Sequence, residues 1–229
     1  MSAVVGVVVF PGSNCEHDVV EAVEALGATA RLLWHAERSL AGVDAVILPG
    51  GFAHGDYLRP GALARFSPIM ETVESFAAEG GAVVGICNGF QVLTEAKLLP
   101  GALQKNRGLT FICQNAEIEI ESDRSVLTSG IAPGTRLNIP INHFEGNYIC
   151  DENTLAELEA EGRIVARYVV NPNGSMGSIA GITNAAGNVV GLMPHPERAI
   201  SALWGSPDGL ILMGALVSSA TAAPTPATR

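Results

Sequence analysis

Positive charge is scarce in this sequence. Only 13 Lys and Arg residues stand against 23 Asp and Glu, which gives a formal net charge of −10. Nucleic acids and anionic membranes are held largely by clustered positive charge, so the chain is a poor candidate for either partner. A small anionic or zwitterionic substrate, held by a few local groups, is still compatible with this balance.

Long apolar runs and paired cysteines are also missing. No stretch reaches the roughly 18 unbroken apolar residues of a membrane span, and no basic leader precedes the apolar residues 3–10. The cysteines show neither a CxxC pair nor the Cys/His spacing of zinc sites. We therefore expect a soluble cytoplasmic protein with reduced thiols and no metal site. The cysteines are Cys15, Cys87, Cys113 and Cys150.

The length and the apolar content favour one folded unit. Of 229 residues, 48% are hydrophobic, which is enough for one sizeable core, whereas the chain is short for two independent domains. The residues from 218 to 229 are rich in Ala, Ser, Thr and Pro. We expect a single domain over residues 1–217 and a disordered tail over 218–229.

Strands and helices alternate along the first hundred residues. Residues 4–10 form a β-branched run typical of a strand buried on both faces of a parallel sheet. The alternation predicts a doubly wound, mostly parallel α/β sheet with helices on both faces. Residues 116–121 instead alternate strictly, which predicts a small antiparallel section. Further expected strands are 29–34, 44–48, 82–86, 179–183 and 189–193, and expected helices are 16–26, 67–78 and 88–97.

Three loops follow the expected parallel strands at their carboxyl ends. They are residues 11–15, 49–56 and 85–89. Ligands of doubly wound sheets bind beyond the carboxyl ends of the strands, so these loops are where a site is expected.

The most distinctive loop is a turn built around a cysteine. The expected strand 82–86 runs through Gly85, Cys87 and Gly89 into a helix, which is the thiol counterpart of the G-x-S-x-G nucleophile elbow. The helix N-terminus would favour the thiolate, and the amide of Asn88 would point to a developing oxyanion. Alternatively, Cys87 is a small buried apolar residue at a tight turn.

A nucleophilic cysteine needs a proton acceptor that is itself held in place. His195 follows the apolar run 189–193 between two prolines, and Glu197 lies two residues on, on the same face of an extended stretch. Alternatively, His195 is a capping or turn residue of a Pro-rich loop. The other histidines are expected at the surface (His17 and His35) or in loops that could border the site (His54 and His143).

Together these residues resemble a known family. The stretch 85–91 and the sequence Pro-His-Pro-Glu at 194–197 are similar to those of the class I glutamine amidotransferases, which have a flavodoxin-like fold. The resemblance implies that Cys87 attacks the side-chain amide of glutamine, that His195 acts as base and then acid, and that Glu197 orients it. A γ-glutamyl thioester would form, ammonia would leave, and water would release glutamate.

Further segments resemble one branch of that family, the glutaminase subunits of phosphoribosylformylglycinamidine synthase. The segments are 11–16, 49–59, 173–175 and 205–209, and the resemblance extends over about residues 3–215. It implies that ammonia passes to a large synthetase subunit, which makes formylglycinamidine ribonucleotide from formylglycinamide ribonucleotide in de novo purine biosynthesis. A small third subunit would bridge the two.

The resemblance also places the cofactors elsewhere. The sequence has no G-x-x-x-x-G-K-[ST] segment that would cradle the phosphates of ATP. We therefore expect no cofactor in this chain, and ATP and magnesium on the synthetase subunit.

The resemblance suggests four residues around the substrate. Gly51 allows the backbone near Phe52 to approach the substrate, and the Phe52 amide would be the second oxyanion donor beside Asn88. Gln91, one helical turn past Cys87, would border the glutamine pocket. Alternatively, Gln91 is a polar helix residue that faces the core.

Two other positions need a separate interpretation, the pair Ala53-His54 and Cys15. Ala53-His54 stand where this branch of the family leads us to expect Ser-Tyr, so a contact of the Tyr hydroxyl is either replaced by His54 or lost. Cys15 begins a helix after a glycine loop but lacks the elbow, and we interpret it as packing or as partner surface.

Three other classes of protein compete with this interpretation. One is an amidotransferase that feeds a different synthase, which the two N-terminal loops disfavour. Another is a cysteine peptidase or glyoxalase-like hydrolase on a similar sheet, which would not be expected to carry a late Pro-His-Pro-Glu. The third is a non-catalytic binding module, which the presence of both Cys87 and His195 disfavours.

Overall fold

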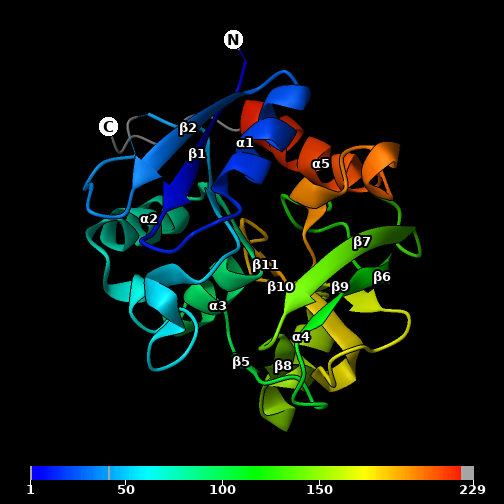
Figure 1. Cartoon of the computed structure of the whole chain (residues 1–229). Helices are drawn as coiled ribbons and strands as arrows, with labels where there is room; N and C mark the ends of the chain where they lie inside the picture. The colour runs from blue at the N-terminus through cyan, green and yellow to red at the C-terminus, as the bar shows by residue number, and fades with distance from the viewer. Residues whose placement is uncertain (1, 41, 223–229) are drawn as a thin grey trace.

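A nine-stranded sheet organises the chain, as the computed structural model shows for residues 2–40 and 42–222 (Figure 1). The strand order is β2-β1-β3-β4-β11-β10-β9-β6-β7. The five strands from β2 to β11 run parallel, and each pair from β11 to β7 is antiparallel. The strands are β1 (Val4–Val9), β2 (Thr29–Trp34), β3 (Ala45–Leu48), β4 (Ala82–Ile86), β6 (Ile112–Ile120), β7 (Arg136–His143), β9 (Ile164–Tyr168), β10 (Ile179–Thr183) and β11 (Val189–Leu192).

Helices cover both faces of the parallel half. In Figure 1, α1 and α5 pack together on one side of these strands, and α2 and α3 lie on the other. A separate two-stranded ribbon, β5 with β8, lies beside the end of α3. The helices are α1 (Glu16–Ala25), α2 (Pro68–Ala78), α3 (Asn88–Glu95), α4 (Glu152–Ala160) and α5 (Gly209–Ala222), and the ribbon strands are β5 (Ala102–Gln104) and β8 (Asn147–Ile149).

Burial along the strands explains why the sequence predicted the parallel half well. Strands β3, β4 and β11 are buried along their whole length, because helices cover both of their faces, and their residues are almost all apolar. Strand β2 lies at the edge, and most of its residues are exposed or half-buried. None of the helices described for residues 2–40 and 42–222 is long and apolar enough to cross a membrane.

The C-terminal prediction needs correction. A disordered tail was expected from Ser218, but α5 continues to Ala222. Ala220 is buried, and the hydroxyl of Ser219 donates to the carbonyl oxygen of Val126 at 3.2 Å. These contacts dock the last turn of α5 on the folded chain. The rest of the expected tail, residues 223–229, lies outside the described residues.

The carboxyl ends of the parallel strands bring the expected loops together. Phe52 N–H donates to Gly12 O at 3.0 Å, which joins the loop after β3 to the loop after β1. Cys87 N–H donates to Leu192 O at 2.8 Å, which joins the turn after β4 to the end of β11. One edge of the sheet therefore carries four neighbouring loops.

Candidate active site

The turn around Cys87 has the strained geometry of an elbow. Cys87 lies between the end of β4 and the start of α3 with φ 50° and ψ −103°, a region that residues other than glycine rarely occupy. Its thiol lies 3.8 Å from the carbonyl oxygen of Asn142, at the end of β7. A strained residue of this kind persists only where its surroundings hold it, and such residues cluster at functional sites.

The glycines on either side of Cys87 allow close packing. A Cβ on Gly89 would collide with the carbonyl group of Leu48 in β3, and a Cβ on Gly85 would press against the backbone of Gly89. The G-x-C-x-G spacing therefore lets α3 start directly against the neighbouring strands.

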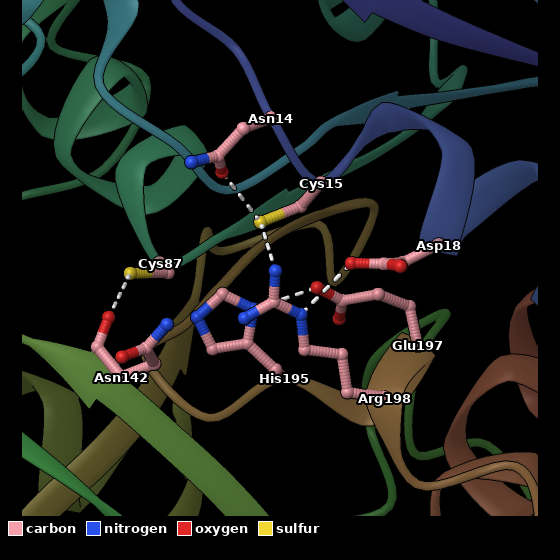
Figure 2. A network of polar contacts seen from close by, with 8 residues as sticks. All are labelled: Asn14, Cys15, Asp18, Cys87, Asn142, His195, Glu197 and Arg198. Atoms are coloured by element: carbon pink, nitrogen blue, oxygen red, sulfur yellow. Dashed lines mark hydrogen bonds and ion pairs between the residues drawn. The ribbon is translucent and has the colours of Figure 1, made fainter.

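His195 and Glu197 form a buried hydrogen-bonded pair. His195 Nδ1 lies 2.6 Å from Glu197 Oε1, and both side chains are almost fully buried. Figure 2 shows the imidazole ring between Cys87 and Glu197. The other ring nitrogen, Nε2, has no hydrogen-bond partner among the described residues. Cys87, His195 and Glu197, the residues predicted as a triad, thus lie near one another although they come from two parts of the chain that are far apart.

The charges around His195 favour its protonated form. Burial opposes the imidazolium, but the carboxylate of Glu197 and then the thiol of Cys87 favour it, and together they hold the pKa of His195 well above its usual value. A histidine with a raised pKa is a strong acceptor for a thiol proton.

Cys15 lies beside the same histidine, where sequence analysis did not place it. Arg198 donates from Nη2 to Cys15 Sγ at 3.2 Å and from Nε to Asp18 Oδ2 at 2.8 Å, as Figure 2 shows. A Cβ on Gly50 would lie 2.6 Å from His195 Cε1 and 3.0 Å from Cys15 Sγ, so a glycine is needed there. Because Cys15 is only 2% exposed, the interpretation as partner surface is wrong.

The environment of Cys15 differs from that of a nucleophile. Burial raises the pKa of the Cys15 thiol, against the lowering effect of His195, so the neutral thiol is favoured. Atoms of Cys15, His195 and Glu197 lie within 4.8 Å of one another and could together hold a metal ion. However, the guanidinium of Arg198 already brings a positive charge to the Cys15 sulfur, and Glu197 Oε1 already pairs with His195 Nδ1.

A cavity of about 330 Å³ opens beside the thiol. This is the size of a small-molecule pocket. Five of the predicted site residues line it: Cys87, His195, Gly51, Phe52 and Gln91. The remaining lining residues are Asn14, Cys15, Asp56, Leu58, Arg59, Pro60, Lys105, Asn142, His143, Phe144 and Glu145.

The two predicted oxyanion donors differ in the hydrogen bonding of their backbone N–H groups. The N–H of Asn88 lies in the first turn of α3, where helical N–H groups have no acceptor within the helix. Phe52 N–H instead donates to Gly12 O at 3.0 Å, so the expectation that this amide is free for an oxyanion is not met. Gly51, directly before it, lines the cavity.

The side chain of Asn88 ties the loop after β3 to the elbow. Its Oδ1 accepts from Ala53 N at 3.0 Å, and its Nδ2 donates to Asp56 Oδ1 at 3.1 Å and to Gln91 Oε1 at 2.9 Å. Gln91 in turn donates from Nε2 to Glu145 O at 2.5 Å. Gln91 therefore lines the cavity and also forms a hydrogen bond to Glu145, another residue that lines it.

The two loop histidines have different surroundings. His143 lines the cavity, where burial and then the neighbouring His195 lower its pKa to about 4. His54 does not line it: its ring packs against those of Phe10 and His35. The Ala53-His54 variation therefore changes the outer packing of the loop, not the cavity wall.

Comparisons with known proteins agree with this geometry. A family model described as a CobB/CobQ-like glutamine amidotransferase domain matches residues 2–207. Phosphoribosylformylglycinamidine synthase subunit PurQ of Rubrobacter xylanophilus is 57% identical over 216 residues, which cover 94% of this chain and 98% of the relative. The protein of the same description from Synechococcus elongatus is 53% identical over 95% of this chain and 99% of the relative.

Solved structures give the same result for the fold. The chain is similar to one in a structure of PurLQS from Thermotoga maritima, with a TM-score of 0.88, 39% identity and coverage of 95% of this chain and 99% of that one. A putative GMP synthase protein from Thermoplasma acidophilum shares the fold at a TM-score of 0.67 and 14% identity, with coverage of 96% of each chain. The predicted fold class is thereby confirmed. The chain belongs to the glutamine amidotransferase family, among the PurQ-type subunits of phosphoribosylformylglycinamidine synthase.

Proposed function

We propose that this chain hydrolyses L-glutamine to glutamate and ammonia, with Cys87 as nucleophile, His195 as base and acid, and Glu197 as the residue that orients the histidine. The observation that carries the proposal is the buried His195–Glu197 pair beside a thiol on a strained turn, at the wall of a small cavity. Triads are recognised by this arrangement and these roles, not by sequence position.

The proposed roles give each proton a path. Glu197 fixes the proton of His195 on Nδ1, which leaves Nε2 to take the thiol proton of Cys87. The thiolate then attacks the amide carbon, and the Asn88 N–H stabilises the oxyanion. When the C–N bond breaks, Nε2 returns its proton to the nitrogen and ammonia leaves. His195 next deprotonates a water molecule, which attacks the thioester, releases glutamate and restores the thiol.

We further propose that the ammonia is used by a partner. Matched relatives are subunits of phosphoribosylformylglycinamidine synthase, and the PurLQS structure contains a similar chain. We infer a complex with a large synthetase subunit, which binds ATP and magnesium, and a small third subunit. Internal passage would keep ammonia from being protonated in bulk water. Four free cysteines fit a reducing cytoplasm as the site of action.

A glutamine analogue tests the nucleophile directly. The full chain is incubated with a diazoketone analogue of glutamine, and the adduct is mapped by peptide mass spectrometry. We expect one adduct on Cys87, blocked by excess glutamine. An adduct on Cys15 instead, or none on Cys87 in the reconstituted complex, would refute the assignment.

A second test separates the glutaminase from the synthetase. Cys87→Ala should abolish glutamine-dependent synthesis by the complex and spare synthesis from added ammonium salt. Glutamine-dependent turnover by this variant would show that another group attacks the amide.

A further inference from the structure

The carboxylate of Glu197 is held by a single polar contact. Its Oε1 pairs with His195 Nδ1 at 2.6 Å, while Oε2 is buried and has no hydrogen-bond partner within residues 2–40 and 42–222. A carboxylate that orients a histidine cannot take its own position from that same histidine. The position of Glu197 must therefore come from its packing and from the short helical turn that carries it, Pro196–Arg198.

Backbone contacts fix this turn to β7 and to α5. His195 N–H donates to Pro140 O in β7 at 2.8 Å. Gly209 N–H, at the start of α5, donates to Ala199 O at 2.8 Å. A Cβ on Gly209 would collide with the carbonyl oxygen of Pro196, so α5 begins directly against the turn.

Arg198 fixes the same turn to α1 through its side chain. Its Nε donates to Asp18 Oδ2 at 2.8 Å, in the first turn of α1, as Figure 2 shows. Its Nη2 donates to Sγ of Cys15, the residue directly before α1, at 3.2 Å. Both donors belong to one planar guanidinium, so one orientation of the side chain makes both contacts. Because Arg198 directly follows Glu197, this tie fixes the end of the turn on which the carboxylate stands.

The tie reaches the imidazole from a second direction. Cys15 N–H donates to Gly50 O at 3.3 Å, and a Cβ on Gly50 would lie 2.6 Å from His195 Cε1. The backbone of Gly50 therefore packs directly against the ring. By binding Cys15, Arg198 connects this loop after β3 with the turn that carries Glu197.

The charge of Arg198 and its position would affect the site in opposite ways. The guanidinium is a second cation near His195, since both lie beside the sulfur of Cys15, and a like charge disfavours the imidazolium. If Arg198 acted by charge alone, its removal would favour the imidazolium and speed the reaction of Cys87. If it acts by position, its removal should slow that reaction.

We propose that Arg198 is a positioning residue of the site, which holds the turn of Glu197 and the loop beside His195 in the arrangement that directs the imidazole at Cys87. This inference rests on the proposed glutaminase function. Arg198 is not among the residues that line the cavity. It should therefore affect the chemical step more than the binding of glutamine.

Arg198→Met tests this role. Met keeps an apolar stem and loses both donors and the charge. The rate of iodoacetamide addition to Cys87 is measured against pH in the full chain, by peptide mass spectrometry. We expect it to fall about tenfold or more near neutral pH, because displacement of a catalytic group by about 1 Å can cost about a hundredfold. The two rates should converge above the folded-state pKa of His195, where the thiolate forms without an imidazolium partner.

Arg136→Met is the matched control. Arg136 Nε donates to Glu119 Oε2 at 3.0 Å, which is the same kind of tie, and it joins β7 to β6 at the other end of β7 from Asn142. Its removal should leave the alkylation profile unchanged. In the reconstituted complex, Arg198→Met should lower kcat for glutamine hydrolysis with little change in KM, and Arg136→Met should change neither.

Milder substitutions test the route of the effect. Arg198→Lys keeps the charge but lacks the forked pair of donors, so its rate should be intermediate. Asp18→Asn keeps an oxygen that can accept from Nε, and it should slow the reaction only slightly. Asp18→Asn should add nothing to Arg198→Met, because Asp18 acts through the guanidinium. If Arg198→Met does not fold, the two milder variants carry the test.

The outcomes are distinct. An unchanged or faster reaction in Arg198→Met would overturn the proposal, and so would a slowing of the same size at every pH, which would indicate general loosening of the fold. A further slowing by Asp18→Asn in the Arg198→Met background would overturn the route through Asp18. If alkylation depends on Arg198 as expected but the original complex does not hydrolyse glutamine, the proposed glutaminase function fails while the positioning role of Arg198 at the thiol stands.

Discussion

Replacing Glu197 by glutamine removes one negative charge from the site and leaves the shape of the side chain almost unchanged. The two side chains have the same shape, so the amide can still approach His195 Nδ1, where the carboxylate oxygen now lies at 2.6 Å. After burial, the carboxylate is the first influence on the pKa of His195, and it raises that pKa. Without it, burial is opposed chiefly by the thiol of Cys87, and the pKa of His195 should fall.

The size of the effect follows from the geometry. A short, fully buried, charge-assisted hydrogen bond becomes a neutral one, which costs roughly 1.5–3 kcal/mol. At about 1.4 kcal/mol per tenfold, the imidazolium–thiolate pair should be about ten- to a hundredfold less populated. Alkylation of Cys87 near neutral pH should slow by the same factor.

The assay is the rate of iodoacetamide addition to Cys87 as a function of pH. The slower rate of Glu197→Gln should be confined to the pH range in which His195 of the original protein is protonated, and the two rates should converge as pH rises above the folded-state pKa of His195. Glu157→Gln, at an exposed position of α4, is the control and should leave the profile unchanged. An unchanged rate and profile in Glu197→Gln would refute the role of the carboxylate.

The same pair links stability to pH. Because the folded-state pKa of His195 is raised, its contribution to stability is complete below the ordinary imidazole value of 6.5. That contribution is lost as pH rises through the folded-state pKa. Thermal unfolding of Glu197→Gln should therefore show a weaker decline over that alkaline range than the original protein, and an identical pH dependence would count against the linkage.

Three further substitutions and two truncations address the scaffold, with melting temperature as the readout. Cys15→Ala should destabilise the fold by about 1–2 kcal/mol through a lost buried sulfur and yet leave the glutamine analogue on Cys87; loss of that adduct would contradict this. Gly89→Ala should lower the free energy of unfolding by more than about 2 kcal/mol, because the new Cβ would collide with the backbone of Leu48. Gly214→Ala, where a Cβ would have ordinary contacts, should be neutral or should stabilise the fold by up to about 1 kcal/mol. Truncation after Ala222 should leave the melting temperature unchanged, whereas truncation after Val217 should lower it, and equal values would show that the last turn of α5 is not docked.

Local sequence patterns were sufficient to predict the parallel half of the sheet and the turn around Cys87. Strands such as 82–86 are apolar along their length because both faces are covered, and this signal needs no knowledge of neighbours. The G-x-C-x-G spacing and the Pro-His-Pro-Glu segment are equally local. Their roles followed from chemistry that requires a thiol, a base and an orienting acid.

The antiparallel half was predicted only in part. Strand β7, strand β9 and helix α4 were not anticipated, and β6 begins earlier than the alternating residues 116–121 indicated. In β7 buried apolar residues alternate with half-buried polar ones, and Pro140 interrupts the strand pattern. Pairing with β6 over eight residue pairs, from Ile112–His143 to Glu119–Arg136, outweighs that weak local signal.

The sequence alone determined the fold class, the elbow and the candidate triad, because each depends on residues that are adjacent or regularly spaced. Only the tertiary structure decided which groups surround them. It placed Cys15 and Arg198 against His195, directed the Phe52 amide to Gly12, and turned Asp56 into the cavity. These outcomes depend on how loops from separate strands meet at one edge of the sheet, and no spacing within a single segment encodes such contacts.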